Sequence, residues 1–109
     1  MDTEIAAWSA AEQELARRVF ERAIHREIEA LIETLRSQAA GLGDREDVWR
    51  FHDFLSIQRH AIEGRQEFQL SGLLFVFADF VRGGLVSLEE LEGLSADKLA
   101  KISAMVRMG

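Results

Sequence analysis

The sequence predicts an all-α protein: a long N-terminal helix, a second helix, and a compact C-terminal helical head. Three observations indicate this class. The 109 residues include no proline, and the eight glycines fall at a few points, so long helices joined by glycine turns are expected. Apolar residues recur at helical spacing. Serines and aspartates suited to capping precede the periodic segments. We therefore expect a single all-helical domain, 1–109, with long helices over residues 9–63 and the head over residues 68–107.

The first helix is expected to begin after Ser9 and to run to about Ala40. Ser9 and Glu12 form a capping box, and Gly41 can end the helix. About 31 residues at 1.5 Å each would make a rod of roughly 46 Å, longer than the roughly 35 Å expected across a compact chain of this size. The overhanging part would need a partner, most commonly a second copy, so we predict a dimerising arm. Its apolar stripe is Phe20, Ile24, Ile28, Leu31 and Leu35.

The second helix is expected to begin at an Asp44 cap and to run to about Glu63, with Gly64 as its stop. At about 100° per residue, one face is apolar. The opposite stripe, roughly 120° wide, is called the Trp49 stripe; it comprises Trp49, His52, Asp53, Ser56, Arg59 and His60. A large aromatic side chain among charged and ionisable groups is typical of a protein-binding surface.

The C-terminal head is expected to contain three helices. Phe68–Val81 is nearly continuous apolar sequence; its length, its lack of alternation and the glycine pair that follows favour a buried helix over a strand. Ser87 and Glu90 form a second capping box before a short helix, and Ser95 can cap the last helix. The residues expected mainly in the core are Phe75, Phe77 and Phe80. Those expected as solvated charges are Lys98, Lys101 and Arg107.

Composition and charge exclude several classes of partner. The net charge of −6 argues against a general nucleic-acid binder and against an anionic membrane surface as the main partner. The absence of cysteine excludes disulfides and thiolate metal sites. The most apolar run, Leu73–Val81, is too short to insert across a bilayer, and the acidic start Met1-Asp2-Thr3-Glu4 lacks the basic residues of a signal peptide. We expect a soluble cytoplasmic protein.

The ionisable residues of the second helix do not predict catalysis or metal binding. His52 and His60 are eight residues apart, about 12 Å along one helix, which is too far for one metal ion. Ser56 lies one turn from both histidines, but no nucleophile elbow or oxyanion-hole loop accompanies it. We therefore expect no catalytic residue, no cofactor and no metal ion. Two roles stay open for the Trp49 stripe: binding another protein, or holding a homodimer together.

Three ordered blocks of sequence resemble the fluorescence recovery protein family of cyanobacteria. The first is Trp49–Ser56, followed by Arg59-His60, the second is Leu74–Ala78, and the third is Leu91–Ile102. The similarity extends through Glu27–Glu33 in the first helix. The resemblance therefore covers nearly the whole chain, and the order of the blocks makes it specific.

The resemblance implies a non-enzymatic helical regulator that works as a homodimer. Members bind the photoactivated, red form of the orange carotenoid protein, chiefly through its C-terminal domain. They speed its return to the orange form and help detach it from the phycobilisome, which restores antenna fluorescence. Such a protein would be cytoplasmic and would meet the phycobilisome at the cytoplasmic face of the thylakoid.

The resemblance also implies roles for six residues. Positions that the family uses for activity or dimerisation correspond to Trp49, His52, Asp53 and Arg59, and positions in contact with the carotenoid protein correspond to Phe75 and Lys101. The sequence departs from the family pattern at Gln58, where a second basic residue is expected, and it contains no tyrosine. Related proteins occur in bacteria without phycobilisomes. The alternative is therefore a helical dimer that serves as an interaction module for a different partner.

Overall fold

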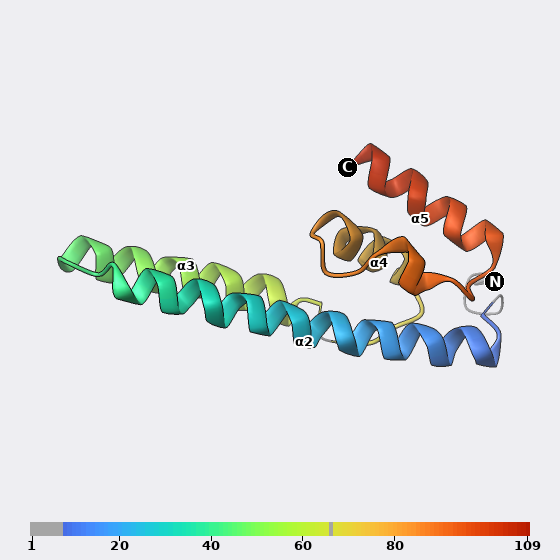
Figure 1. Ribbon diagram of the computed structural model, residues 1–109, viewed down its shortest axis with the longest axis horizontal. Coiled ribbons are helices and arrows are strands. Elements are labelled where there is room, and N and C mark those ends of the chain that lie inside the picture. Colours follow the sequence, from blue (N-terminus) through green and yellow to red (C-terminus); the bar gives the residue numbers. More distant parts are fainter. Residues whose placement is uncertain (1–7, 66) are drawn as a thin grey trace. The chain divides into compact units, whose positions relative to one another are not determined.

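The computed structural model describes residues 8–65 and 67–109, and these residues confirm the all-α class. They form four α-helices and one short 3-10 helix, and no strand occurs among them (Figure 1). The elements in chain order are α2 (Ala10–Ala40), α3 (Arg45–Glu63), α4 (Leu73–Arg82), η1 (Leu88–Leu91) and α5 (Ala96–Met108). The expected long N-terminal helix and the C-terminal helical part are both present.

The predicted caps set the helix boundaries. Ser9 N donates to Glu12 Oε1 at 3.0 Å, and Glu12 N donates to Ser9 Oγ at 3.1 Å, which completes the capping box of α2. Asp47 N donates to Asp44 Oδ1 at 2.9 Å at the start of α3. Each bond satisfies a backbone donor that a helix N-terminus otherwise leaves without a partner. The remaining predicted caps, at Ser87 with Glu90 and at Ser95, are also present.

The apolar run that starts at Phe68 is helical only from Leu73, so the expected helix over 68–81 was too long. Gly72 adopts φ 78°, a left-handed conformation that glycine enters without steric cost, and α4 begins directly after it. The Phe68 ring packs edge-on against Phe20 with centroids 5.5 Å apart. The residues before Leu73 therefore cover the core as a loop.

The chain divides into two compact units. We call residues 8–25 and 68–109 the head unit, and residues 26–65 and 67 the hairpin unit. Helix α2 contributes to both, because the division falls between His25 and Arg26. That the chain behaves as a single domain stays a prediction, and each unit is described by itself.

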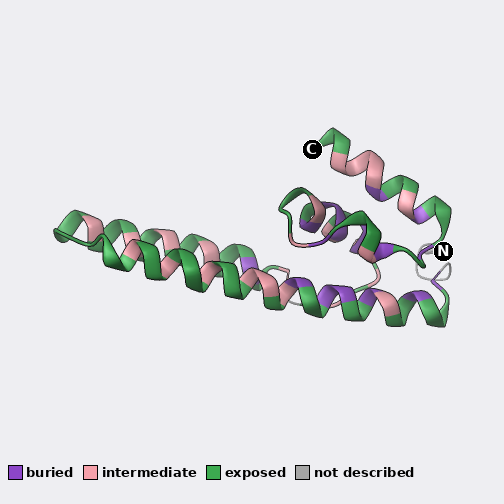
Figure 2. Cartoon of the chain, in the orientation of Figure 1, coloured by how far each residue is buried: buried purple, intermediate pink, exposed green. Residues whose placement is uncertain are grey.

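The head unit has a continuous apolar core. Fourteen buried apolar residues, from α2, α4, α5 and the segments next to them, form one cluster, which appears as the buried positions of these elements in Figure 2. Phe20 of α2 lies 6.0 Å from Phe80 of α4, ring centre to ring centre, and Ile102 of α5 is fully buried. Phe77 and Phe80 are in the core, as predicted.

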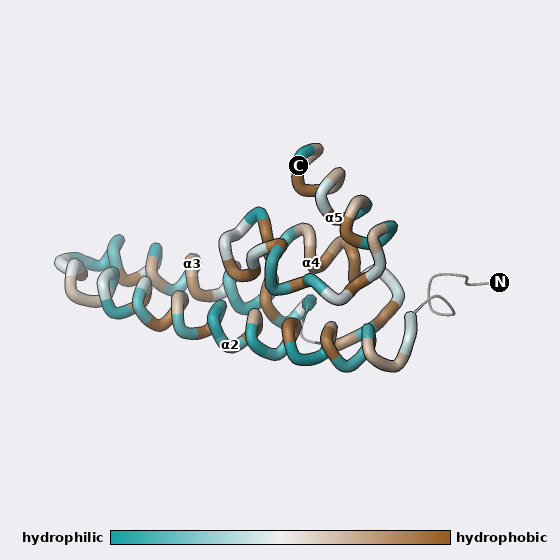
Figure 3. The backbone as a smooth tube through the Cα atoms, turned by 45° about the vertical axis from the view of Figure 1, so that its right-hand side comes forward, coloured by the Kyte–Doolittle hydropathy of each residue, from teal (hydrophilic) through white to brown (hydrophobic). Residues whose placement is uncertain are grey.

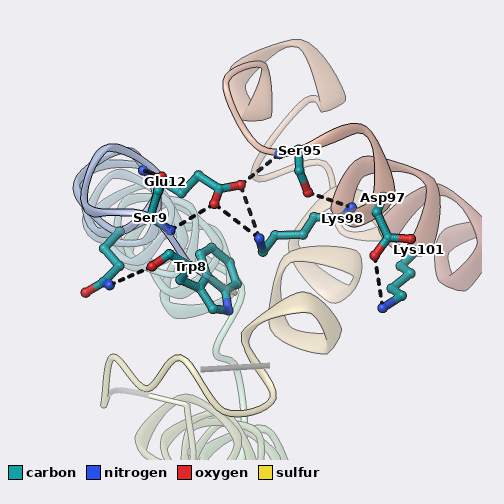
Figure 4. A network of polar contacts seen from close by, with 8 residues as sticks. Trp8, Ser9, Glu12, Ser95, Asp97, Lys98 and Lys101 are labelled. Carbon is teal, nitrogen blue, oxygen red and sulfur yellow. Dashed lines mark hydrogen bonds and ion pairs between the residues drawn. The ribbon is translucent and has the colours of Figure 1, made fainter. Parts of the chain in front are cut away.

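A buried ion pair joins the start of α2 to the start of α5 (Figure 4). Lys98 Nζ lies 3.2 Å from both carboxylate oxygens of Glu12, and the two residues are only 5% and 8% exposed. Ser95 N donates to Glu12 Oε2 at 2.8 Å, in addition to the bond from Ser9 N. The Lys98 ammonium also lies 4.8 Å from the Trp8 ring centre, a cation–π distance. We call this arrangement the Glu12–Lys98 clasp.

The clasp corrects the expectation that Lys98 is a solvated charge. Burying an ammonium group is costly unless a counter-charge and hydrogen bonds accompany it. Glu12 supplies that counter-charge from 86 residues away in the sequence. The backbone hydrogen bond from Ser9 is the largest influence on the Glu12 carboxyl; with the bond from Ser95 and the Lys98 ammonium, it outweighs the opposing effect of burial and lowers the pKa of Glu12 to about 2.

Lys98→Met should destabilise the head unit by about 3 kcal/mol, because the substitution leaves the Glu12 carboxylate buried without its counter-charge. Lys101→Met is the matched control on the same helix. Lys101 pairs with Asp97 at 3.2 Å on the exposed surface, so its loss should cost less than about 1 kcal/mol. Urea unfolding followed by circular dichroism measures both values. Equal losses in the two variants would contradict a stabilising clasp.

The clasp should also make stability depend on pH in the acid range. The pKa of Glu12 is depressed from 4.5 in the unfolded reference to about 2 in the folded protein, so its contribution is present above about pH 4.5 and is lost as the pH falls through about 2. Comparison with Glu12→Gln isolates this carboxyl from the others. The difference in unfolding free energy between the two proteins should shrink from pH 5 to pH 2. If the difference in unfolding free energy between the two proteins does not change with pH, the pKa of Glu12 is not lowered by folding.

Candidate functional site

The hairpin unit consists of two helical segments side by side: α2 from Arg26 onward, and α3 (Figures 1 and 3). At the turn, Gly43 N donates to Asp47 Oδ2 at 2.9 Å. At the other end, Arg65 Nη2 donates to Glu27 Oε2 at 2.6 Å, and both side chains are partly buried. One of these contacts stabilises the turn, and the other joins the two helical segments at the opposite end of the hairpin.

The hairpin unit has almost no core of its own. Among its residues in the described ranges 26–65 and 67, Ile62 is the only buried one, and both helices are mainly exposed or intermediate in Figure 2. Hydrophobic positions nevertheless recur along both helices (Figure 3). Its exposed large apolar residues are Ile28, Ile32, Leu42, Val48, Trp49, Leu55 and Ile57. These exposed apolar side chains are available for contact with another chain.

Every residue of the Trp49 stripe is exposed, as helical spacing predicts, and Trp49 itself is 59% exposed. His52 Nδ1 lies 3.3 Å from Asp53 Oδ1. Arg59 Nε donates to Glu63 Oε1 at 2.5 Å, and this hydrogen bond raises the pKa of Arg59. Sequence reasoning missed Glu63 as the partner of Arg59, although the spacing of four residues on a helix could have indicated it.

Among the grooves on the hairpin, two of the described ones share no residue. The turn groove, about 520 Å³, is lined by Gln38, Gly41, Leu42, Asp47, Arg50, Phe51, Asp53, Phe54 and Ile57. The arm groove, about 310 Å³, is lined by Ile28, Leu31, Leu55, Arg59, Ile62 and Glu63. At about 100° per residue, Ile57 and Leu55 point roughly 160° apart. The two grooves therefore open on opposite sides of α3.

The grooves separate residues that the sequence placed in one stripe. Asp53 lines the turn groove and Arg59 lines the arm groove, whereas Trp49 and His52 line neither. A helix that packs through one face leaves both flanks and the outer edge accessible. Within the Trp49 stripe, Trp49 and His52 therefore lie on the outer edge of α3. Asp53 belongs to the groove on one side of that edge, and Arg59 belongs to the groove on the other side.

The apolar stripe predicted along the dimerising arm is divided between the two units. Phe20 is buried in the core of the head unit, and Ile24 packs against that core. Ile28 and Leu31 line the arm groove, and Leu35 is half-buried. A role for the stripe in dimerisation stays a prediction, and the part accessible to a second copy is the part in the hairpin unit.

Phe75 and Lys101 both lie exposed on the head unit. Phe75 is 66% exposed, so its expected place in the core was wrong. It falls one turn from Asp79 on the polar face of α4, whereas Phe77 and Phe80 point to the other face. Lys101 is exposed on α5 beside Asp97. A large exposed aromatic side chain is available for contact with another protein.

Groups for metal chemistry are not assembled in the part of the chain that the structure describes. Within residues 8–65 and 67–109, no three His, Cys, Asp or Glu side chains come together in a way that could hold a metal ion. None of the described helices combines the length and the apolar character that crossing a membrane requires.

The described residues form an all-helical regulator-like fold whose hairpin leaves apolar side chains exposed. Residues 8–106 match the family described as photoprotection regulator fluorescence recovery protein. The chain is also 42% identical over 108 residues to a fluorescence recovery protein of Synechocystis sp., covering 99% of each chain. It belongs to the fluorescence recovery protein family, which is a regulatory family and not an enzyme family.

Solved structures of the family share this fold. The fluorescence recovery protein of Fremyella diplosiphon superposes with a TM-score of 0.87 at 46% identity, covering 93% of this chain and 99% of that one. The protein of Synechocystis sp. PCC 6803 superposes with a TM-score of 0.85 at 43% identity, covering 92% and 98%.

Phe20→Ala should lower the free energy of unfolding much more than Phe75→Ala, because Phe20 lies in the core and Phe75 lies on the surface. Phe20→Ala opens a cavity in the head unit and should cost about 3–5 kcal/mol. Phe75→Ala removes an exposed ring and should change the unfolding free energy by less than about 0.5 kcal/mol. Urea unfolding at neutral pH measures both changes. A large loss of stability for Phe75→Ala would mean that this ring is packed within the protein.

Proposed function

We propose that this protein is a non-enzymatic regulator of photoprotection. It binds the photoactivated orange carotenoid protein through that protein's C-terminal domain, accelerates the red-to-orange reversion, and helps detach the carotenoid protein from the phycobilisome. Membership of the fluorescence recovery protein family supports this proposal. The observation that carries it is the hairpin unit, whose apolar and aromatic side chains remain exposed in a single chain.

The arm groove is the surface at which two copies associate in the cytoplasmic homodimer. Its walls are apolar, and its polar residues, Arg59 and Glu63, carry opposite charges. A two-fold interface places the same patch of both chains together. A charge-balanced patch suits this arrangement, because Arg59 of each copy can approach Glu63 of the other. The helical stripe at Ile28, Leu31 and Leu35 would then be covered.

To accelerate reversion, this protein must bind the transition state between the red and orange forms of the carotenoid protein more tightly than the red form. A binder accelerates reversion only if it stabilises the transition state more than the red starting state. Trp49 supplies an exposed aromatic anchor, and Phe75 supplies a second one on the head unit. His52, Asp53 and Lys101 supply polar and charged groups that fix orientation and steer encounter.

The rate of orange-form recovery in the dark tests the proposal. Photoactivated carotenoid protein should revert faster with this protein than without it, as followed by visible absorbance. Trp49→Ala should slow that accelerated reversion about tenfold or more, because it removes an aromatic anchor, and the variant should stay dimeric on a sizing column. An unchanged recovery rate with the unmodified protein would sink the photoprotective assignment and favour a helical dimer that serves a different partner.

A further inference from the structure

Helix α5 packs on α4 in the head unit (Figure 1), and it is held unevenly along its length. Its two buried residues, Lys98 and Ile102, both lie in its first half. After Ile102, every residue of the helix is half-buried or exposed. Burial of apolar surface therefore stabilises the second half of α5 less than the first. A helix end with so little buried surface opens easily unless another contact holds it.

Arg82, the last residue of α4, supplies such a contact. Arg82 Nη1 donates to the carbonyl oxygen of Met105 at 2.7 Å, and Arg82 Nη2 donates to Asp79 Oδ1, one turn earlier on α4. The Arg82 side chain also lies so close to Gly109 that a Cβ atom there would collide with the guanidinium group. A cationic donor is favourable at a helix C-terminus, because the carbonyl groups there carry partial negative charge. Arg82 thus joins the ends of α4 and α5.

The contact at Met105 also affects Lys101, one turn earlier on α5. In an α-helix the amide of Met105 bonds to the carbonyl of Lys101, so opening of the helix end frees the backbone from Lys101 onward. The Lys101 side chain is exposed and pairs with Asp97 at 3.2 Å, and an exposed pair of this kind does little to fix a helix. A side chain on a mobile helix end loses more conformational freedom when it binds a partner.

We propose that Arg82 is a positioning residue of the head unit, which holds the second half of α5 in place and thereby fixes Lys101 for contact with the partner protein. This inference rests on the proposed function, in which Lys101 meets the carotenoid protein. Arg82 itself stays bound to Met105 and Asp79 and does not touch the partner. Phe75 is carried by α4, which five buried residues anchor, so its placement does not depend on Arg82.

Amide hydrogen exchange of the full chain tests whether Arg82 holds α5. Arg82→Met should speed exchange of the Met105 and Val106 amides about tenfold, because a hydrogen bond from a charged donor is lost. Arg82→Lys should keep most of the protection, since an ammonium group can also donate to the Met105 carbonyl. Arg107→Met removes an exposed cation from the end of the same helix and should speed exchange less than about threefold. Equal effects of Arg82→Met and Arg107→Met, or no effect of either, would overturn the inference.

Double-mutant cycles on partner binding test the link between Arg82 and Lys101. Arg82→Met and Lys101→Met should each weaken binding of the photoactivated carotenoid protein about fivefold. The double variant should bind as Lys101→Met does, because no side chain is left for Arg82 to position. The effects of Arg82→Met and Phe75→Ala should instead be additive. Loosening of the whole head unit would couple Arg82 to both residues, and direct contact of Arg82 with the partner would be additive with both, so either pattern contradicts a positioning role.

The two measurements separate this inference from the proposed function. If the unmodified chain does not bind the carotenoid protein, the proposed function fails, and hydrogen exchange alone decides whether Arg82 holds α5. If the unmodified chain binds but the effects of Arg82→Met and Lys101→Met are additive, the proposed function stands and the positioning role of Arg82 fails. Faster exchange at the end of α5, together with coupling to Lys101 and not to Phe75, is the result expected.

Discussion

Two helices cannot enclose a core, and this constraint governs the hairpin unit. The hairpin unit pairs one segment of α2 with α3, and each helix can bury only the strip that faces the other. Ile62 is the single buried residue among those described in this unit, whereas the head unit assembles fourteen buried apolar residues from several elements. The surplus apolar surface of the hairpin is available to other chains. The head unit keeps its own apolar residues inside.

The head unit depends on a polar interaction placed at its edge. Glu12 closes the first turn of α2, meets the first turn of α5 through Ser95, and neutralises Lys98. One carboxylate thereby satisfies two backbone donors and a buried cation. Burying an isolated charge costs free energy. The Glu12 carboxylate and the Lys98 ammonium therefore stabilise each other in the folded protein. The clasp fixes which part of α5 faces α2, a specificity that apolar packing alone supplies less sharply.

Different sides of the hairpin carry different kinds of side chain. Because α3 packs through one strip, its two flanks and its outer edge present different residues. One flank combines apolar walls with the balanced pair Arg59 and Glu63, the other combines them with Asp47 and Asp53, and the edge carries Trp49.

Features that depend on near neighbours along the chain could be predicted from the sequence. The capping box of α2, the Asp44 cap and the exposure of Trp49 follow from residues three or four positions apart, because one helical turn brings such residues together. Other features depend on contacts between residues that are far apart in the sequence. Lys98 is buried because Glu12 reaches it from the far end of the chain. Phe75 is exposed because α4 packs through its other face, and the arm stripe divides because the head unit buries Phe20 and not Leu31. The burial of each of these residues depends on which helices pack against each other. The spacing of apolar residues along one helix does not give that information.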